Sequence, residues 1–272
     1  MRGEAFRFRQ FRVRHDRCGM KVGTDGILLG AWTDGSGANR ILDIGTGSGL
    51  IALMLAQRYP PARITAIEPD ETAAKQATGN VHDSPWSGRI DVQPVSLQQF
   101  VTDIAGAGQY DLLVCNPPFF AGGTPSPETA RHQARNSSQL DADELLPASR
   151  DLLAEHGRLS LVIPAGQESA MCRTGRWLGL KPRRVTHVRP FANRRANRVL
   201  LELQANAGES AGVESSLVIY DQPGVYSSAY RKLTGDYYLD PDALTSPPAP
   251  QVNRAGSRAP EAAEAVCQRG AI

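Results

Sequence analysis

The sequence predicts an α/β fold built on a doubly wound, mostly parallel β-sheet. Short apolar runs typical of buried strands alternate with segments of helical composition, and Gly or Pro residues separate them. Strands that alternate with helices of about 10–15 residues are typical of βαβ units, whose crossovers place successive strands parallel. Hydrophobic residues make up 41% and charged residues 21% of the chain, values that disfavour a disordered or fibrous protein.

The first half of this pattern lies in residues 40–115. A helix over 50–58 ends before Pro60, because proline cannot continue it. A second helix, over 70–81, begins after Asp70, whose short carboxylate suits an N-cap. Strands are predicted at residues 40–44, 63–68, 89–95 and 110–115.

The second half is less regular. Residues 116–139 are polar, rich in Gly and Pro, and too long for an ordinary connection, so they form either a functional loop or a mobile segment. A helix is predicted over 141–155. Strands are predicted at 159–163, 184–191 and 199–204, followed by an edge strand at 217–220 and a short helix at 227–238.

Composition divides the chain into three parts. Residues 1–39 form a basic segment whose one strong signal is an apolar patch at 27–32. Residues 40–240 form the α/β domain. Residues 241–272 are rich in Pro, Ala and Ser, with almost nothing to bury, and are predicted to be a disordered tail.

Several classes of protein are disfavoured by what the sequence lacks. It has no run of about 18 apolar residues that could cross a membrane, and its start lacks the apolar core of a secretory signal. The 4 cysteines lie far apart, which disfavours a disulfide framework and a zinc ribbon, and the 5 histidines lack the spacing of metal ligands. We therefore expect a soluble, cytoplasmic protein without a metal site.

Positive charge gathers in two segments. Residues 1–21 carry a net charge of +5 and residues 173–198 carry +9 with no acid, so the remaining residues must carry −12 to give the overall +2. Such segregation is typical of proteins that bind a phosphate backbone. The alternative is a basic face that is merely solvated.

A glycine loop, Asp43-Ile-Gly45-Thr-Gly47-Ser-Gly49, joins a predicted strand to a predicted helix. Glycines allow the tight turn and bring backbone amides close to a ligand at the helix N-terminus. The spacing differs from the dinucleotide fingerprint, and Asp43 would repel a pyrophosphate, so a cationic or amine-bearing ligand is favoured. Glu68 ends the next strand, where its carboxylate can accept both hydroxyls of a ribose. The alternative is that the glycines serve only the turn.

The turn Asn116-Pro117-Pro118-Phe119 follows the fourth predicted strand, at the sheet edge where α/β proteins bind their substrates. The prolines fix the backbone, so the Asn116 carboxamide oxygen and the Pro117 carbonyl can accept the two hydrogens of one planar amine. Phe119 offers a face on which a base can stack. The alternative is a rigid turn that only ends a strand. Cys115, beside this turn, is interpreted as a core thiol.

The glycine loop followed by Glu68 resembles the S-adenosylmethionine site of the Rossmann-like, class I methyltransferases. With Asn-Pro-Pro-Phe added, the order of motifs resembles the amino-group methyltransferases, which act on adenine, guanine or glutamine nitrogens. The resemblance implies a seven-stranded, mostly parallel sheet with an antiparallel last strand, and residues 184–204 fit its closing hairpin.

Three further segments are similar to those of the bacterial tRNA(Val) adenine-N6 methyltransferases: residues 15–32, 84–86 and 228–238. The similarity spans roughly residues 6–240. It implies methyl transfer from S-adenosylmethionine to the N6 of the anticodon-adjacent adenine of a valine tRNA.

The resemblance also assigns roles to residues of this chain. Residues 1–39 would close over the cofactor, whose adenine amine would be taken by Ser96 or by main-chain groups, since no acid ends the third strand. Asn116, Pro117 and Phe119 would bind the base. The cofactor would be held by Lys21, Thr24, Asp25, Asp43, Gly45, Gly47, Gly49 and Glu68.

Contacts to tRNA are predicted from the basic residues, and the protein is expected to be a monomer. The pair Arg131-His132 could touch a phosphate, or could be a solvated part of the loop. Trp32, Trp86 and Trp177 are interpreted as packing residues. The densest basic cluster, expected to hold the RNA while the adenine leaves its stack, is Arg183, Arg184, Arg194, Arg195 and Arg198.

Three alternatives remain open at this point. A protein glutamine-N5 methyltransferase shares the Asn-Pro-Pro turn but typically carries a helical N-terminal domain, and here fewer than 40 residues precede the first core strand. A ribosomal RNA guanine-N2 methyltransferase is harder to separate by sequence. A non-catalytic RNA-binding protein on the same scaffold would have no need of both Asn116 and the glycine loop.

Overall fold

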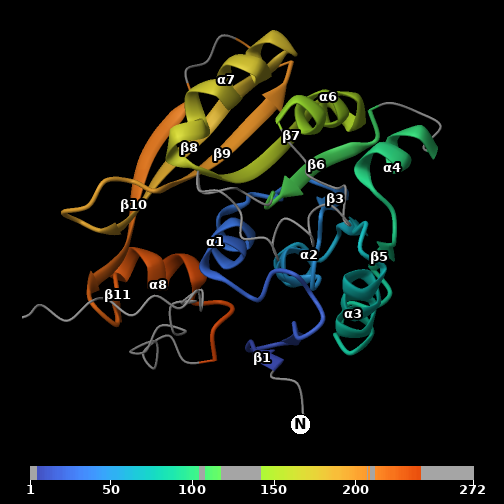
Figure 1. The fold of residues 1–272 in the computed structure, drawn as a ribbon, viewed down its shortest axis with the longest axis horizontal. Helices are drawn as coiled ribbons and strands as arrows, with labels where there is room; N and C mark the ends of the chain where they lie inside the picture. The colour runs from blue at the N-terminus through green and yellow to red at the C-terminus, as the bar shows by residue number, and fades with distance from the viewer. Residues whose placement is uncertain (1–4, 104–107, 118–141, 207, 209–211, 240–272) are drawn as a thin grey trace, which may run out of the picture.

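The computed structural model describes residues 5–103, 108–117, 142–206, 208 and 212–239 (Figure 1). A single nine-stranded sheet runs through them, in the order β11-β10-β8-β9-β7-β6-β3-β4-β5. Seven consecutive strands, from β8 to the edge strand β5, are β3 (Arg40–Ile44), β4 (Arg63–Ile67), β5 (Ile90–Gln93), β6 (Tyr110–Cys115), β7 (Leu153–Pro164), β8 (Leu180–Phe191) and β9 (Arg198–Ala205).

These seven strands confirm the predicted class I methyltransferase topology. β9 is antiparallel to both of its neighbours, β7 and β8, while β3 to β7 pair in parallel. The strand predicted at residues 217–220 is β10 (Val213–Gln222), which pairs in parallel with β8 and extends the sheet beyond seven strands. Its predicted place at the edge is wrong, because β11 (Val225–Tyr226) pairs with β10 on its other side and forms the outer edge.

Helices cover both faces of the sheet. Alternate residues of a strand point to opposite faces, so Leu112 and Val114 of β6 enter one apolar core and Leu113 and Cys115 enter the other. The first core holds α1 (Thr24–Trp32), α2 (Leu50–Arg58), α3 (Glu71–His82) and α8 (Ser228–Thr234). The second holds α4 (Leu97–Asp103), α6 (Ala142–Leu152) and α7 (Glu168–Trp177).

The helix α1 explains the apolar patch noted in the sequence. Seven consecutive residues, 26–32, are buried, so this helix is apolar on all sides and lacks the periodicity by which surface helices are found. It packs on α2, where Gly30 lies so close to Met54 that a Cβ would approach the sulfur to 2.7 Å. The N-terminal segment therefore contributes to the same core as α2.

Several predicted boundaries are wrong by a few residues, and the largest difference is at the start of β7. The helix expected over 141–155 ends at Leu152, and β7 begins at Leu153 instead of residue 159. Leu153 pairs with Tyr110, and the register then shifts before Leu112, which is the mark of a β-bulge. Helical composition alone could not reveal this pairing, because its partner strand lies more than 40 residues away.

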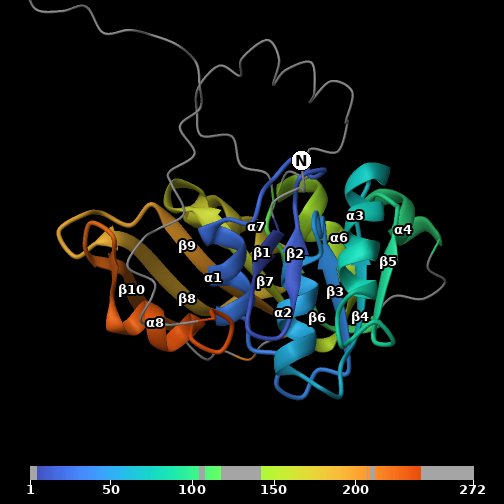
Figure 2. The ribbon, with the colours of Figure 1, turned by 90° about the horizontal axis from the view of Figure 1, so that it is seen from below.

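A small hairpin lies outside the helical layer. β1 (Ala5–Arg7) and β2 (Arg12–Arg14) pair antiparallel, and Figures 1 and 2 place them on the outer side of α1 and α2. None of the helices in the described part of the chain is long and apolar enough to cross a membrane.

Candidate active site

The glycine loop between β3 and α2 uses its glycines for two different purposes. Gly45, Gly47 and Gly49 have φ values of +68°, +57° and +82°, which residues with a Cβ rarely adopt. A Cβ on Gly45 or Gly47 would meet no atom within 4 Å, so the space above these two residues is open. A Cβ on Gly49 would touch Ala77 of α3 at 3.5 Å. Gly45 and Gly47 thus face a cavity, whereas Gly49 packs against a helix.

Asp43 lies beneath the loop and is fully buried. Its Oδ2 accepts hydrogen bonds from the Thr46 hydroxyl at 2.5 Å and from the Ala52 amide at 3.1 Å. Its Oδ1 has no hydrogen-bond partner in the described part of the chain. Burial, which outweighs these hydrogen bonds, raises the pKa of Asp43 to about 7. The carboxyl group therefore shapes the loop and does not line the cavity.

Glu68, just beyond β4, fixes the middle of the loop. Its Oε2 accepts the Gly47 amide at 2.9 Å and its Oε1 accepts the Asp70 amide at 3.0 Å. Burial raises the pKa of this carboxyl group above its ordinary value. Each oxygen retains capacity for a further hydrogen bond, because a carboxylate offers about four acceptor sites.

Ser96 has a structural role in the geometry observed. Its hydroxyl accepts the Gln99 amide at 3.3 Å, and it donates to the Gln99 Oε1 at 3.1 Å. The Gln99 Oε1 also accepts the Ser96 amide, which completes a capping box at the start of α4. Ser96 does not line the cavity.

A cavity of about 520 Å³ opens over the glycine loop, within the range of small-molecule sites. Four segments far apart in the sequence form it: the N-terminal residues 19–26, the loop with the start of α2, the two residues that follow β6, and the start of β9. It brings together the predicted site residues Lys21, Thr24, Asp25, Gly45, Gly47, Asn116, Pro117 and Arg198.

Asn116 follows β6 directly, and the next residue, Pro117, is buried. The helix α1 approaches Asn116 at Gly26, where a Cβ would lie 3.9 Å from the Asn116 Nδ2 and 3.1 Å from Leu50. The absence of a side chain at Gly26 therefore allows α1 to form one wall of the cavity. Three predicted site residues lie outside the described residues: Phe119, Arg131 and His132.

Sequence reasoning missed two amides on α3 that hold the N-terminal segment. Gln76 is buried, and its Oε1 accepts the Arg17 amide at 3.0 Å and the Cys18 thiol at 2.8 Å. Its Nε2 donates to Asp16 at 2.6 Å. One side chain thus fixes three consecutive residues that lead into the cavity wall.

Asn80, one turn later, has only 1% of its surface exposed. It accepts the Arg14 amide at 3.0 Å and donates to the carbonyls of Arg14 and Ser48, each at 2.8 Å. Asn80 therefore joins β2 directly to the glycine loop. The sequence feature that could have revealed this role is the spacing of Gln76 and Asn80, four residues apart on a helix face that otherwise carries alanines.

The five arginines of the predicted RNA-binding cluster lie at two places. Arg194 and Arg195 are exposed in the turn between β8 and β9, and Arg198 lies at the cavity with its Nε 2.9 Å from the Asp25 Oδ2. Arg183 and Arg184 lie near the start of β8. Because β8 and β6 run in the same direction in the sheet, the start of β8 is at the edge opposite Asn116.

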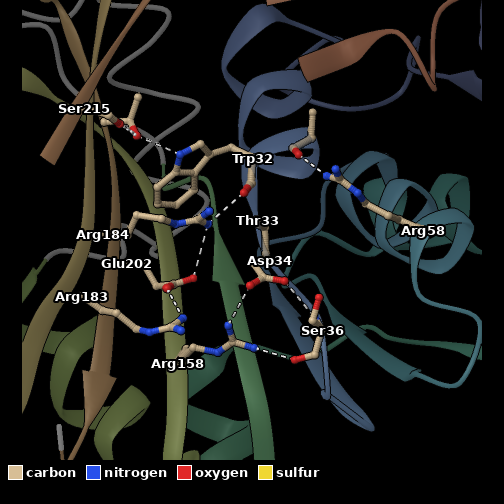
Figure 3. A network of polar contacts seen from close by, with 12 residues as sticks. Trp32, Thr33, Asp34, Ser36, Arg58, Arg158, Arg183, Arg184, Glu202 and Ser215 are labelled. Atoms are coloured by element: carbon tan, nitrogen blue, oxygen red, sulfur yellow. Dashed lines mark hydrogen bonds and ion pairs between the residues drawn. The ribbon is translucent and has the colours of Figure 1, made fainter. Parts of the chain in front are cut away.

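Arg183 and Arg184 belong to a packed network (Figure 3). Glu202 of β9 is fully buried, and its two oxygens lie 2.8 Å from Arg183 and 3.5 Å from Arg184. The Arg184 guanidinium lies 3.8 Å from the ring centroid of Trp32 and donates to the Trp32 carbonyl at 2.9 Å. The contacts of these two arginines are thus with the protein itself.

The tryptophans differ in environment. Trp32 is buried against Arg184, and Trp86 packs in the core beside Phe11, as expected. The prediction for Trp177 is wrong, because 85% of its surface is exposed at the end of α7. Among the described residues, no three His, Cys, Asp or Glu side chains are grouped so that they could hold a metal ion.

Asp43 gives a prediction about pH. The folded protein holds the Asp43 proton up to about pH 7, whereas the ordinary value for an aspartate is 3.8. The folded state therefore binds one more proton than the unfolded state between these values, and this group makes the free energy of unfolding fall as pH rises through that window. In Asp43→Asn, whose amide oxygen can still accept from Thr46 and Ala52, this contribution should vanish. Urea unfolding from pH 4 to 7 measures it, and parallel curves for the two proteins would contradict it.

The Glu202 network gives a prediction about stability. Replacing both Arg183 and Arg184 with Ala should lower the free energy of unfolding by about 3–5 kcal/mol, because a buried carboxylate would lose its counterions. Adding Glu202→Gln should restore most of the loss, since the buried charge is then gone. Denaturant unfolding of the double and triple variants tests this. If the triple variant is no more stable than the double, the loss comes from the Trp32 stacking.

Comparisons with known proteins find similarity to methyltransferases. Residues 23–173 match the family model of the methyltransferase small domain. A protein of Aeromonas hydrophila named tRNA1(Val) (adenine(37)-N6)-methyltransferase is 44% identical over 239 residues, which cover 88% of this chain and 98% of that protein. A protein of the same name from Serratia proteamaculans is 44% identical over 235 residues, covering 86% and 89%.

Among solved structures, a predicted O-methyltransferase from Agrobacterium tumefaciens has the same fold, with a TM-score of 0.63 at 16% identity over 78% of this chain and 96% of that one. At that identity the likeness concerns the fold alone. The identity to the curated relatives, over nearly their whole length, shows the family. The chain is a methyltransferase and belongs to the tRNA1(Val) (adenine(37)-N6)-methyltransferase family.

Proposed function

We propose that this protein transfers the methyl group of S-adenosylmethionine to the exocyclic N6 of an adenine in tRNA, the adenine at position 37 named for its relatives. The observation that carries the proposal is the placement of Asn116 and Pro117 in the wall of one cavity with Gly45 and Gly47. An amine-binding turn and a glycine loop that meet at one cavity are what methyl transfer to a planar amine requires.

The residues at the cavity fit S-adenosylmethionine. The open space over Gly45 and Gly47 lets a ligand approach the backbone closely. Glu68 is not among the residues that line the cavity, but it lies next to the loop, bonded to the Gly47 amide, and its remaining acceptor sites suit the two hydroxyls of a ribose.

Lys21, Asp25 and Arg198 line the cavity, and Asp25 is paired with Arg198. The two cations suit the carboxylate of an amino-acid end, and the remaining acceptor sites of Asp25 suit its ammonium group. The cofactor, when bound, supplies an electrophilic methyl group on a sulfonium.

The chain's own part in the reaction is to orient the amine. The lone pair of N6 is delocalised into the purine, which makes the amine a poor nucleophile. The Asn116 carboxamide oxygen and the Pro117 carbonyl accept its two hydrogens and favour a pyramidal nitrogen whose lone pair points at the methyl group. Orientation of this kind contributes to the rate without a strong base.

The basic turn after β8 supplies the RNA contacts in this proposal. Arg194 and Arg195 are exposed beside Arg198, at the same edge of the sheet as Asn116. They would hold phosphates of the anticodon region while the adenine leaves its stack to enter the cavity. A tRNA substrate also implies a cytoplasmic protein. We further propose that the protein is a monomer.

Asn116 provides the test of the reaction. Asn116→Ala should lower the turnover number about 100-fold or more, because an interaction made in the transition state is lost. Cofactor affinity, measured by calorimetry, should stay unchanged. The assay is transfer of labelled methyl to bulk tRNA that lacks its native modification, followed by nucleoside analysis for N6-methyladenosine.

The matched control is Asn39→Ala, an exposed asparagine at the start of β3, at the opposite edge of the sheet. It should behave as wild type. If the label appears in ribosomal RNA or in a protein instead of tRNA, the protein is a ribosomal RNA methyltransferase or a protein methyltransferase. Binding of tRNA with neither cofactor binding nor methyl transfer would favour a non-catalytic RNA-binding role.

The basic turn provides the test of RNA binding. Reversing the charge of Arg194 and Arg195 with Glu should weaken tRNA binding and flatten its dependence on salt, because phosphate contacts are lost, while cofactor affinity stays unchanged. The control changes Arg173 and Arg176, two exposed arginines of α7, to Glu and makes the same change in net charge. Equal weakening in both variants would show that net charge alone matters.

A further inference from the structure

The β1–β2 hairpin has two chemically different faces. Its inner face is aromatic: Phe8 stacks on Phe11 with ring centroids 4.5 Å apart, and Phe11 meets Trp86 at 5.6 Å. Its outer face carries three exposed arginines, Arg7, Arg12 and Arg14, which we name the arginine ribbon. The alternation of Arg with apolar residues in residues 6–14 therefore separates a packing face from a charged one.

The arginine ribbon places like charges opposite one another. Arg7 of β1 pairs directly with Arg12 of β2, so their side chains lie on the same face of the hairpin. Like charges in this position destabilise a pair of strands. Asp83 lies 3.2 Å from Arg12 and 2.8 Å from Arg14, whereas Arg7 has no ion-pair partner among the residues that the structure describes. The ribbon is thus incompletely neutralised by the protein.

The ribbon adjoins the cavity. The Arg14 backbone is bonded to Asn80, whose side chain also donates to the carbonyl of Ser48, a residue of the cavity wall. Five residues after Arg14 the chain itself lines the cavity, from Gly19 onward. Figure 2 shows β1 and β2 on the outside of the molecule, where a large ligand has access to them.

We propose that the arginine ribbon binds the phosphate backbone of the RNA substrate, as a second contact separate from the turn after β8. The proposal rests on the proposed function in that the ligand is RNA. A rise of about 3.4 Å per residue puts Arg12 and Arg14 about 7 Å apart, and Arg7 faces Arg12 across the hairpin. A polyanion that binds there would neutralise the opposed charges that the protein leaves uncompensated.

The variant Arg7→Gln should affect two measured quantities differently: tRNA affinity should fall, and the thermal stability of the free protein should not. It should weaken tRNA binding about three- to tenfold at low salt and lower the slope of log affinity against log salt by about 1, because one phosphate contact is lost. The thermal midpoint of the free protein should stay the same or rise, because the charge opposite Arg12 is gone. At saturating RNA the turnover number should not change, so the effect falls on KM.

Two further variants complete the experiment. Arg7→Lys keeps the charge and should retain the wild-type salt slope. Arg176→Gln on α7 makes the same change in net charge on an exposed helix that Figure 1 shows on the far side of the sheet, and it should leave RNA affinity nearly unchanged.

Three outcomes would overturn the proposal. The first is an Arg7→Gln protein that binds tRNA as tightly as wild type, and the second is an equal loss of tRNA affinity in Arg7→Gln and Arg176→Gln. The third is an Arg7→Lys protein whose tRNA affinity is as low as that of Arg7→Gln. A lowered thermal midpoint with unchanged affinity would make Arg7 structural. Failure of the proposed function is distinguishable, because it would abolish methyl transfer by the wild type while leaving the RNA-binding comparison readable.

Discussion

The buried carboxyl group of Asp43 is the constraint on which the cavity depends. It accepts from the Thr46 hydroxyl and from the Ala52 amide, so it fixes both the loop and the first turn of α2. With these two elements held, the left-handed backbone at Gly45 and Gly47 leaves open space where side chains would otherwise stand. Asp43 therefore determines the shape of the cavity, whereas Gly45 and Gly47 form the surface that a ligand would contact.

A second constraint is the attachment of the N-terminal segment to α3. Gln76 and Asn80 are neutral, buried, and bonded to backbone groups of residues 14–17. Because Asn80 also bonds to Ser48, the outer hairpin, the helix and the glycine loop form one connected unit. Lys21, at the cavity wall, therefore owes its position to a helix that itself contributes no residue to the cavity.

The alternation of strands and helices predicted the mostly parallel sheet, and the family resemblance implied its antiparallel last strand. Glycine spacing and strand-end motifs are local signals, so the sequence also predicted part of the cavity lining, including Gly45, Gly47 and Asn116. It did not allow α1 to be recognised, since a helix buried on all sides has no amphipathic period. Nor could the sequence show that Arg184 and Arg194 have different environments, because both lie in the same stretch without acidic residues. Only the buried Glu202, which is distant in the sequence, and the direction of β8 place them at different edges.

Both ends of α1 contact the hairpin formed by β8 and β9. Asp25, in its first turn, is bonded to Arg198, and Trp32, its last residue, is stacked on Arg184. Arg184 and Arg198 lie on the adjacent strands β8 and β9, so each end of α1 is attached to one of these two strands. The turn between these strands lies at the Arg198 end, so it is joined through Arg198 to Asp25, the neighbour of Gly26, whose Cα faces Asn116. The ion pair between Arg198 and Asp25 therefore links the position of that turn to the wall of the cavity.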